Sequence, residues 1–200
     1  MLQTQTIQPN LLELLKKIMA SEVFKGFNLV GGTSLALQIG HRFSVDIDMF
    51  GHSEINEFEF IEELSLFGKV ITIKKSKSII IFSVDGIKVD FVNYKYPLLE
   101  NINIIDTVRL VSDKDIAAMK LNAIAGRGSR KDFVDLYFLL KKYSLKEIIH
   151  FYNQKYIDGS EFMVLKSLNY FEDAENEEMP IMFEEIDWSH IKKTIIEAIY

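Results

Sequence analysis

The period of the hydrophobic pattern changes once along this chain, near Pro97. Before that residue, short apolar runs typical of strands alternate with stretches of helical spacing, and beyond it the pattern is almost entirely helical. A chain with this order folds as a sheet-and-helix core followed by helices, so we expect an α+β protein. We expect an α/β core over residues 1–103 and a helical region over residues 104–200.

The amino-terminal half predicts both strands and helices. Helices are expected at 11–20, 33–39 and 55–67, and strands at 27–30, 45–50, 69–74, 78–83 and 87–93. Gly40 is expected to end the second helix. Asp85-Gly86 predicts a hairpin turn between the last two strands, and the last three strands form an antiparallel meander.

The expected helices beyond Pro97 carry start signals. Ser112 and Asp115 form an acidic variant of the capping box, and Ser144 and Glu147 form a regular one. The helices are expected at 113–125, at 131–142, from Ser144 onward, at 160–172 and at 188–200.

Composition and charge limit the classes of function. A 48% hydrophobic fraction is enough to bury a core, and a net charge of −6 argues against a protein that coats nucleic acid non-specifically. The absence of cysteine excludes disulfides, a thiolate nucleophile and cysteine zinc sites. With no signal-peptide pattern and no apolar run of membrane-spanning length, we expect a cytoplasmic protein without membrane contact.

The charge is unevenly distributed along the chain. Residues 114–146 hold eight basic and three acidic side chains, whereas residues 172–187 hold eight acidic and no basic ones. The basic stretch would steer an NTP or an RNA end if its lysines cluster in space. The alternative is a set of scattered, solvated helix faces.

Three aspartates carry the most specific chemical signal. Asp46 and Asp48 lie two residues apart on one expected strand, so their carboxylates share a face and repel unless a cation lies between them. Asp90 lies in an apolar run, where an unpaired carboxylate is costly. If the two strands are neighbours, the three carboxylates converge and suit Mg²⁺. The solvated face of a strand is the alternative for the Asp46 and Asp48 pair alone.

A double glycine precedes the aspartates. Gly31 and Gly32 would let the backbone approach a phosphate, while the start of the next helix offers N–H groups and the Thr33 hydroxyl. A double glycine by itself is more often a tight turn. Together with the three aspartates, it is a layout for metal-assisted transfer of a phosphorus-centred group.

Other phosphate-binding and hydrolytic patterns fit less well. The chain has no Gly-Lys-Ser/Thr ending of a P-loop and no Gly-x-Gly-x-x-Gly turn, and its four histidines suggest no catalytic triad or zinc site. His41 alone leads into the acidic strand. It is interpreted equally well as a catalytic residue and as a loop residue that fixes local hydrogen bonds.

Two blocks of this sequence carry a more specific pattern. The first runs from Gly31 to Leu37 and continues from His41 to Phe50, and the second runs from Lys120 to Gly128 and continues from Lys131 to Tyr137. Together they resemble the AbiEii/AbiGii toxin family of the DNA polymerase β-like nucleotidyltransferase superfamily. With Asp90, the matches span about residues 27–140. Gly32-Thr33 stands where many superfamily members carry Gly-Ser, a change that keeps the hydroxyl.

The resemblance implies a nucleotidyltransferase fold, whose helical region completes the active-site cleft. The activity it implies is Mg²⁺-dependent transfer of a nucleoside monophosphate from an NTP to an acceptor hydroxyl, with release of pyrophosphate. Asp46 and Asp48 would hold two Mg²⁺ ions, and Asp90 would complete the site and favour deprotonation of the hydroxyl. The residues implied in nucleotide binding are Gly31, Gly32, Thr33, Lys120, Arg127 and Lys131.

Four further residues within the two blocks are implied as supporting ones: Arg42, Ser44, Asp132 and Asp135. The last two lie three apart on one helix face, where they would orient Lys120 or Arg127 or form a plain salt bridge. Without the resemblance, an ordinary solvated lysine is the favoured interpretation of Lys120.

The resemblance also implies a toxin of an abortive-infection or toxin–antitoxin system, with RNA such as a tRNA end as acceptor and a cognate antitoxin as partner. Two alternatives stay open. The acceptor hydroxyl would belong to a small molecule or a protein, or the chain would be a non-catalytic binding module on the same fold. Residues after about 143 match no motif.

Overall fold

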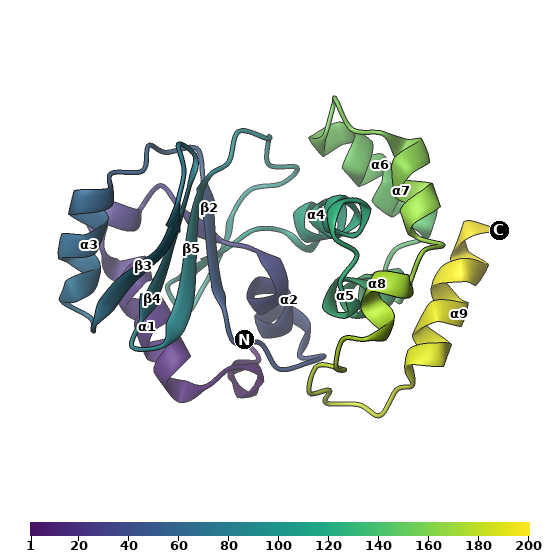
Figure 1. Ribbon diagram of the computed structural model, residues 1–200, viewed down its shortest axis with the longest axis horizontal. Helices are drawn as coiled ribbons and strands as arrows, with labels where there is room; N and C mark the ends of the chain where they lie inside the picture. The colour runs from purple at the N-terminus through teal and green to yellow at the C-terminus, as the bar shows by residue number, and fades with distance from the viewer. The chain divides into compact units, whose positions relative to one another are not determined.

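The computed structural model describes all 200 residues, which form two compact units. One unit comprises Met1–Lys95 and Ile102–Val111, and the other comprises Tyr96–Asn101 and Ser112–Tyr200. The first unit holds the whole sheet and the second is helical (Figure 1), which confirms the expected α+β class. None of the helices is long and apolar enough to cross a membrane.

The first unit is built on a seven-stranded mixed sheet. Its strands are β1 (Asn28–Leu29), β2 (Ile47–Gly51), β3 (Val70–Lys75), β4 (Ile79–Val84), β5 (Ile87–Asn93), β6 (Asn103–Ile105) and β7 (Val108–Leu110). In space they follow the order β3-β4-β5-β2-β1-β7-β6. The neighbours β2 and β5 run parallel, as do β1 and β7, and the other neighbours run antiparallel.

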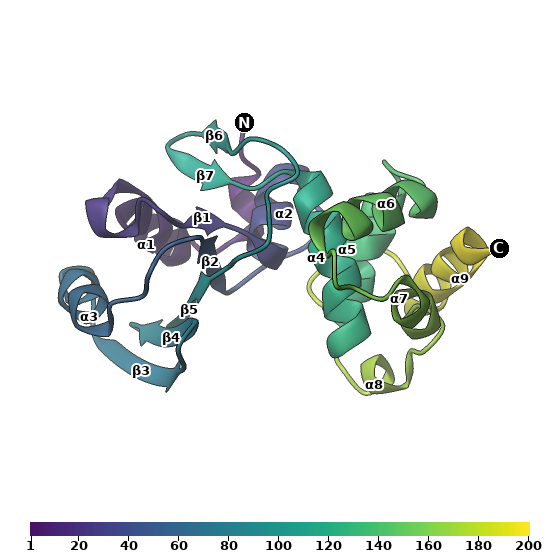
Figure 2. The same cartoon turned by 90° about the horizontal axis from the view of Figure 1, so that it is seen from above.

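Three helices flank this sheet, together with short 3-10 turns at Thr4–Thr6 and Glu22–Phe24. They are α1 (Pro9–Ala20), α2 (Gly31–Ile39) and α3 (Glu57–Ser65). Helices α1 and α3 lie on one side of the sheet and α2 on the other (Figure 2). Gly40 ends α2 in the left-handed conformation, at φ 75°, and the β3-β4-β5 meander forms with its turn at Asp85-Gly86, as the sequence predicts.

The core of this unit lies between the sheet and helices α1 and α3. Alternate side chains of β2 and β5 point into it, so Ile47, Met49, Val89 and Phe91 are fully buried. The Phe91 ring stacks on Phe24 at 4.8 Å between centroids. The residues between these buried ones therefore face the opposite side of the sheet, and among them are two of the candidate aspartates.

The expectation of helical structure beyond Pro97 is wrong for β6 and β7. These strands have three residues each, too few to show an alternating pattern, and they form by pairing with each other and with β1 at Leu29. Asp106 and Thr107 make the turn between them, both at positive φ. The structure thus places residues 104–111 with the sheet.

The second unit consists of six helices. They are α4 (Asp113–Gly126), α5 (Arg130–Leu140), α6 (Leu145–Lys155), α7 (Glu161–Ser167), α8 (Glu172–Glu175) and α9 (Trp188–Ile199). Ser112 caps α4 by accepting the Asp115 N–H at 3.0 Å, and Ser144 and Glu147 form the full capping box of α6, as predicted.

The single helix expected at 160–172 is instead divided into α7 and α8. The side chain of Asn169 donates a hydrogen bond to the carbonyl oxygen of Leu165 at 3.1 Å. Such a bond satisfies a carbonyl that the next helical N–H would otherwise take, so it competes with continuation of the helix.

A buried ion pair attaches Tyr96–Asn101 to the helices of the second unit. The ammonium of Lys155 lies 2.7 Å from Asp115 and donates to the carbonyl oxygen of Pro97, also at 2.7 Å. The same carboxylate accepts the backbone N–H of Leu99 at 3.0 Å. All polar groups of the pair are therefore satisfied, as burial of two charges requires.

Gly51 is the last residue of β2, and the backbone of Gly26 packs closely against it. A Cβ atom at this position would lie 1.9 Å from the carbonyl oxygen of Gly26, so Gly51→Ala is expected to lower the free energy of unfolding by about 1–3 kcal/mol. Gly126→Ala is the matched control, because its Cβ would meet nothing within 4 Å and the change is expected to stabilise by about 0.4–1 kcal/mol. Urea denaturation followed by circular dichroism measures both, and equal stability of the two variants would contradict this packing.

Candidate active site

Strands β2 and β5 bring two of the three candidate aspartates together. Asp48 and Asp90 are direct partners in the parallel register, so both side chains leave the same face of the sheet. Asp46 directly precedes β2 rather than lying within it. The side chains of Asp46 and Asp48 are half-buried, and the side chain of Asp90 is 16% exposed. The neighbouring strands that the sequence analysis required are therefore present.

Lys88 shares this face with the aspartates, two residues before Asp90. Its ammonium lies 2.7 Å from Asp90 Oδ2. Burial lowers the pKa of Lys88, but the hydrogen bond to Asp90 and the charges of Asp90, Asp48 and Asp46 outweigh it, so the net pKa is raised above 10.5. One ammonium thus senses all three carboxylates. Sequence reasoning missed Lys88, although its position two before Asp90 on a strand was the available signal.

The second oxygen of Asp90 makes the site suitable for a cation. Asp90 Oδ1 is buried and has no hydrogen-bond partner, which is costly for a carboxylate oxygen in the absence of a positive charge. No three Asp, Glu or His side chains of the chain are arranged so as to hold a metal ion as they stand. The chemistry of the donors nevertheless fits Mg²⁺, which prefers carboxylate oxygens and completes its shell with water and phosphate.

The double glycine lies against this acidic face. Gly31 has φ 69°, and a Cβ there would lie 2.5 Å from Asp48 Oδ2. A Cβ at Gly32 would lie 2.1 Å from a guanidinium nitrogen of Arg42, which is buried. Both glycines are thus needed for close approach, and together they place the start of α2 between a carboxylate and a guanidinium.

The start of α2 offers backbone N–H groups toward a ligand. Val30, the residue before the helix, makes no side-chain capping bond, so the first-turn N–H groups are not capped by that side chain. The adjacent guanidinium of Arg42 adds positive charge to the positive end of the helix dipole. This combination favours a phosphate group.

The Thr33 hydroxyl positions the segment that leads into β2. It is buried and donates a short hydrogen bond to the backbone carbonyl of Asp46. Since its one proton is used there, Ser44 is the donor in the 2.8 Å bond between the two hydroxyls. The backbone N–H of Ser44 in turn donates to the carbonyl oxygen of Thr6 at 2.8 Å. Thr33 and Ser44 therefore hold the segment that carries Asp46.

Four of the candidate residues of the second unit form one network around two buried aspartates: Lys120, Arg127, Asp132 and Asp135. The ammonium of Lys120 lies 2.9 Å from Asp132 and 2.5 Å from Asp135. Arg127 binds Asp132 through two nitrogens, at 2.8 and 3.1 Å, and Ser129 donates to the same carboxylate at 2.7 Å. Both aspartates are fully buried, and Lys120 itself is buried, so the interpretation of Lys120 as a solvated lysine is wrong. Ser129 was not predicted.

Two of the candidate cations of the second unit reach the surface. The Arg127 side chain is 62% exposed although it binds Asp132, so part of the guanidinium faces solvent. Lys131, at the start of α5, is also exposed. Lys120 by contrast is only 6% exposed, and Asp132 and Asp135 orient it. The network therefore combines a buried, oriented ammonium with an exposed guanidinium.

Asp132 is the electrostatic centre of this network. Burial alone raises the pKa of its carboxyl, but the charge of Lys120 and the hydrogen bonds from Arg127 and Ser129 outweigh it and hold the pKa far below 3.8. The charges and hydrogen bonds around Asp132 thus favour its ionised form.

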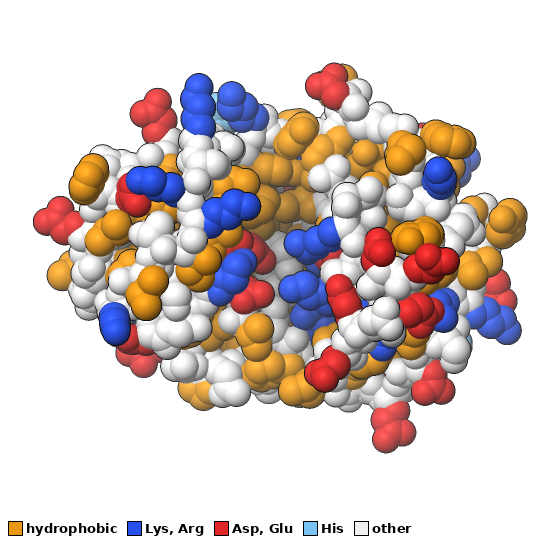
Figure 3. Space-filling model, in the orientation of Figure 1, with side chains coloured by type: hydrophobic (Ala, Val, Ile, Leu, Met, Phe, Trp, Pro, Cys, Tyr) orange, Lys and Arg blue, Asp and Glu red, His pale blue; other side chains and the backbone are white.

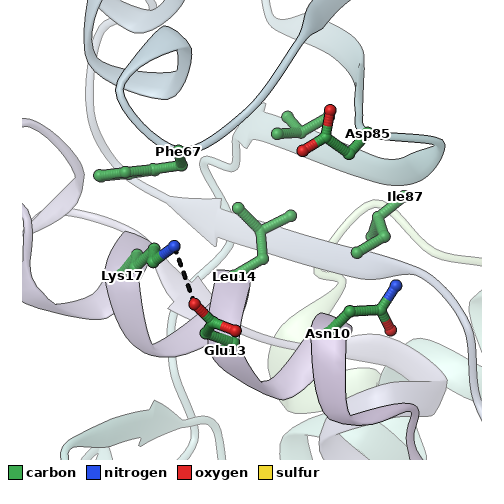
Figure 4. A pocket seen from close by; sticks show the side chains of 8 residues that line it. Asn10, Glu13, Leu14, Lys17, Phe67, Asp85 and Ile87 are labelled. Atoms are coloured by element: carbon green, nitrogen blue, oxygen red, sulfur yellow. Dashed lines mark ion pairs between the residues drawn. The ribbon is translucent and has the colours of Figure 1, made fainter.

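A cavity of about 190 Å³ lies elsewhere in the first unit, between α1 and the turn that joins β4 to β5 (Figure 4). The ion pair of Glu13 and Lys17, at 3.0 Å, lies on its α1 side. The cavity is lined by Asn10, Glu13, Leu14, Lys17, Phe67, Val84, Asp85 and Ile87. None of the candidate site residues is among them.

Solved structures with a similar fold include nucleotidyltransferases. MenT4, a nucleotidyltransferase toxin from Mycobacterium tuberculosis H37Rv, aligns with a TM-score of 0.61 at 13% identity over 95% of this chain and 81% of its own. JHP933 from Helicobacter pylori aligns with a TM-score of 0.57 at 18% identity over 94% of this chain and 85% of its own. The chain therefore has a nucleotidyltransferase-like fold.

Sequence comparison places the chain within a family. The family described as nucleotidyl transferase AbiEii toxin, type IV TA system, matches residues 13–199. The uncharacterized protein aq_aa25 of Aquifex aeolicus (strain VF5) is 39% identical over 189 residues, which cover 90% of each chain. This protein belongs to the AbiEii family of nucleotidyltransferase toxins, which confirms the resemblance carried by the two sequence blocks.

Removal of the central charge is expected to destabilise the second unit. Asp132→Asn takes one of two carboxylate partners from the buried ammonium of Lys120 and removes the charge that binds Arg127, so it should lower the free energy of unfolding by about 3–5 kcal/mol at pH 7. Because the folded-state pKa is depressed, this contribution is present above the ordinary value of 3.8 and is lost as the pH falls toward the folded-state pKa. Urea denaturation at pH 7 and pH 3 should therefore show a smaller difference from wild type at pH 3.

The matched control for this prediction is an exposed ion pair. The side chains of Glu13 and Lys17 are 69% and 44% exposed, respectively. Glu13→Gln breaks their ion pair and should change the free energy of unfolding by less than about 1 kcal/mol. If Asp132→Asn is as mild as this control, the network does not carry the stability assigned to it.

Proposed function

We propose that this chain transfers a nucleoside monophosphate from an NTP to a hydroxyl of RNA, such as a tRNA end, in a Mg²⁺-dependent reaction. The observation that carries this proposal is the register of β2 and β5, which sets Asp48 opposite Asp90 on a face against which Gly31 packs. The same few residues thus combine a cation-binding set with the start of a phosphate-binding helix.

The chemistry assigns distinct tasks to the aspartates. The acceptor oxygen attacks the α-phosphorus, the bond from that phosphorus to the bridging oxygen of the β-phosphate breaks, and pyrophosphate leaves with the electron pair. The hydroxyl proton passes to solvent water, and the negative charge of Asp90, whose Oδ2 is held by Lys88, favours this deprotonation. Asp46, Asp48 and Asp90 would hold Mg²⁺, which supplies Lewis-acid stabilisation of the charges on the attacking and leaving oxygens.

The triphosphate is assigned to backbone and cationic groups. The N–H groups at Gly32 and Thr33 and the guanidinium of Arg42 bind it in the first unit, a role supported by the two close approaches at the glycines. Lys120, Arg127 and Lys131, which belong to the helical unit, are proposed as further phosphate-binding residues. For Lys120 this role is supported by its orientation between two aspartates. Because the ammonium is already held in place, binding a phosphate costs little further side-chain entropy.

Transfer is tested with purified protein, Mg²⁺, each of the four α-labelled NTPs and total cellular RNA. Asp48→Asn is expected to reduce labelling of RNA by at least about 100-fold, because charge stabilisation at the reacting phosphorus is lost. Glu62→Gln, an exposed carboxylate on α3, is the matched control and should label as wild type does. Circular dichroism confirms that both variants are folded.

The same assay decides between classes of acceptor. Labelling of RNA with wild-type protein supports the proposal. Labelling that appears only with protein or metabolite fractions would assign the acceptor to those classes, and equal labelling by Asp48→Asn would contradict the site.

The toxin–antitoxin context predicts a phenotype in cells. Induced expression of the wild-type chain should arrest growth, and Asp48→Asn should relieve the arrest at equal protein levels, because the arrest depends on transfer. Colony counts after induction measure this, with an immunoblot as the control for expression. We propose a cognate antitoxin as the partner that suppresses the arrest. Growth arrest that persists in the Asp48→Asn variant would mean that toxicity does not depend on this site.

A further inference from the structure

An aromatic pair continues the acidic face of the sheet beyond the aspartates. Phe50 lies two residues after Asp48 on β2, and Tyr94 follows β5 four residues after Asp90, so strand alternation puts all four side chains on one face. The rings are 5.1 Å apart between centroids and tilted by 47°. The backbone N–H of Tyr94 donates to the carbonyl oxygen of Gly51 at 2.8 Å, which extends the pairing of the two strands as far as Tyr94.

The surface around this pair is apolar where a solvated strand face would be polar. Val92 is the direct partner of Phe50 on one side and of Ile79 on the other, so three apolar side chains form one row across the sheet. Phe50, Val92 and Tyr94 are half-buried and Ile79 is 37% exposed. A row of this kind matches the flat, apolar face of a nucleobase.

Two lysines, Lys77 and Lys95, lie at the same end of the sheet, and a third, Lys74, lies level with Asp90 on β3. The carbonyl oxygen of Ser78 accepts the Asn93 N–H at 2.8 Å, which sets the β3-β4 turn with Lys77 beside the end of β5, where Lys95 follows Tyr94. Lys74 belongs to the row of Ile81 and Asp90 on the acidic face. Figure 3 shows Lys and Arg side chains along the upper edge of this unit, on the left of the view.

These lysines differ from the other cations near the site. Lys88 is bound to Asp90 and Lys75 to Glu57, at 2.7 and 2.6 Å, whereas Lys74, Lys77 and Lys95 are exposed and make no ion pair. Exposed lysines without acidic partners are suited to bind phosphates of a polynucleotide.

We propose that this surface binds the 3′ end of a single-stranded RNA acceptor, with the terminal base on Phe50 and Tyr94 and the preceding phosphates at Lys74, Lys77 and Lys95. The inference rests on the proposed transfer to a hydroxyl. Two residues of strand span about 7 Å, which is the scale that separates a ribose hydroxyl from its own base. A base on Phe50 thus leaves its ribose hydroxyl near Asp48 and Asp90. A protein or small-molecule acceptor would need neither the stacking surface nor these lysines.

The test measures binding without transfer. A 12-nucleotide single-stranded RNA with a 5′ fluorophore is compared, by fluorescence anisotropy without NTP, with the same RNA whose 3′-terminal nucleotide is abasic. Wild-type protein should bind the complete RNA about 5- to 100-fold more tightly, the range that stacking of one base supplies. Phe50→Leu and Tyr94→Leu should abolish this preference, while Tyr94→Phe, which keeps the ring, should retain it.

Controls separate stacking from charge and from folding. Phe58→Leu, an aromatic that is 85% exposed on α3, should keep the preference for the complete RNA. Lys74→Gln should weaken both RNAs equally and reduce the slope of log Kd against log salt by about 0.7, as loss of one phosphate contact to a single strand does. Lys16→Gln, an exposed lysine of α1, should leave the slope unchanged.

The outcomes distinguish this inference from the proposed function. Equal binding of the two RNAs by wild type, or a preference that survives Phe50→Leu, overturns the stacking site, and a tighter complex with DNA of the same sequence overturns the choice of RNA. If the preference behaves as expected while no RNA is labelled in the transfer assay, the binding site stands and the proposed transfer fails. If RNA is labelled and Phe50→Leu leaves the KM for RNA unchanged, the transfer stands and this site fails.

Discussion

The parallel pairing of β2 with β5 is the constraint on which the site depends. It sets Asp48 directly opposite Asp90. Two carboxylates at this separation repel each other, and the structure offsets the repulsion with Lys88, whose ammonium binds one oxygen of Asp90 and leaves the other without a partner. A shift of one residue in the register would turn one aspartate into the apolar core, so the buried side chains of β2 and β5 also specify the site.

Backbone and side-chain contacts together position the charged groups around the acidic face. The glycines allow α2 to begin against Asp48 and Arg42, where any side chain would collide. Thr33 uses its hydroxyl to hold the backbone of Asp46, so the hydroxyl that suggests a phosphate ligand in the sequence acts on the protein itself. In the second unit, Asp132 plays the corresponding part by orienting Lys120 and Arg127. Charged groups in both units are thus held by their neighbours before any ligand binds, which lowers the entropic cost of binding.

Most of the elements and the family were predictable because their signals are local. Helix periodicity, the Ser144 capping box and the Asp85-Gly86 turn each depend on a few adjacent residues, and the two sequence blocks carry the resemblance to the family. The hairpin of β6 and β7 was missed because its three-residue strands are stabilised by a distant partner at Leu29. The helix expected at 160–172 was overextended because the side-chain bond of Asn169 to the backbone leaves no periodic signal.

The sequence by itself determined the residue types available to the candidate site: oxygen donors without thiols, a glycine-opened helix and a basic helical stretch. Only the tertiary structure decided which of them meet. Lys88 and Asp90 are close in the chain, but the charges of Asp46 and Asp48 act on Lys88 only because β2 pairs with β5. The burial of Lys120 and the contact of Phe50 with Tyr94 also arise from packing between distant segments. Local patterns specify which face a side chain leaves, whereas its partners depend on long-range pairing that no short stretch of sequence encodes.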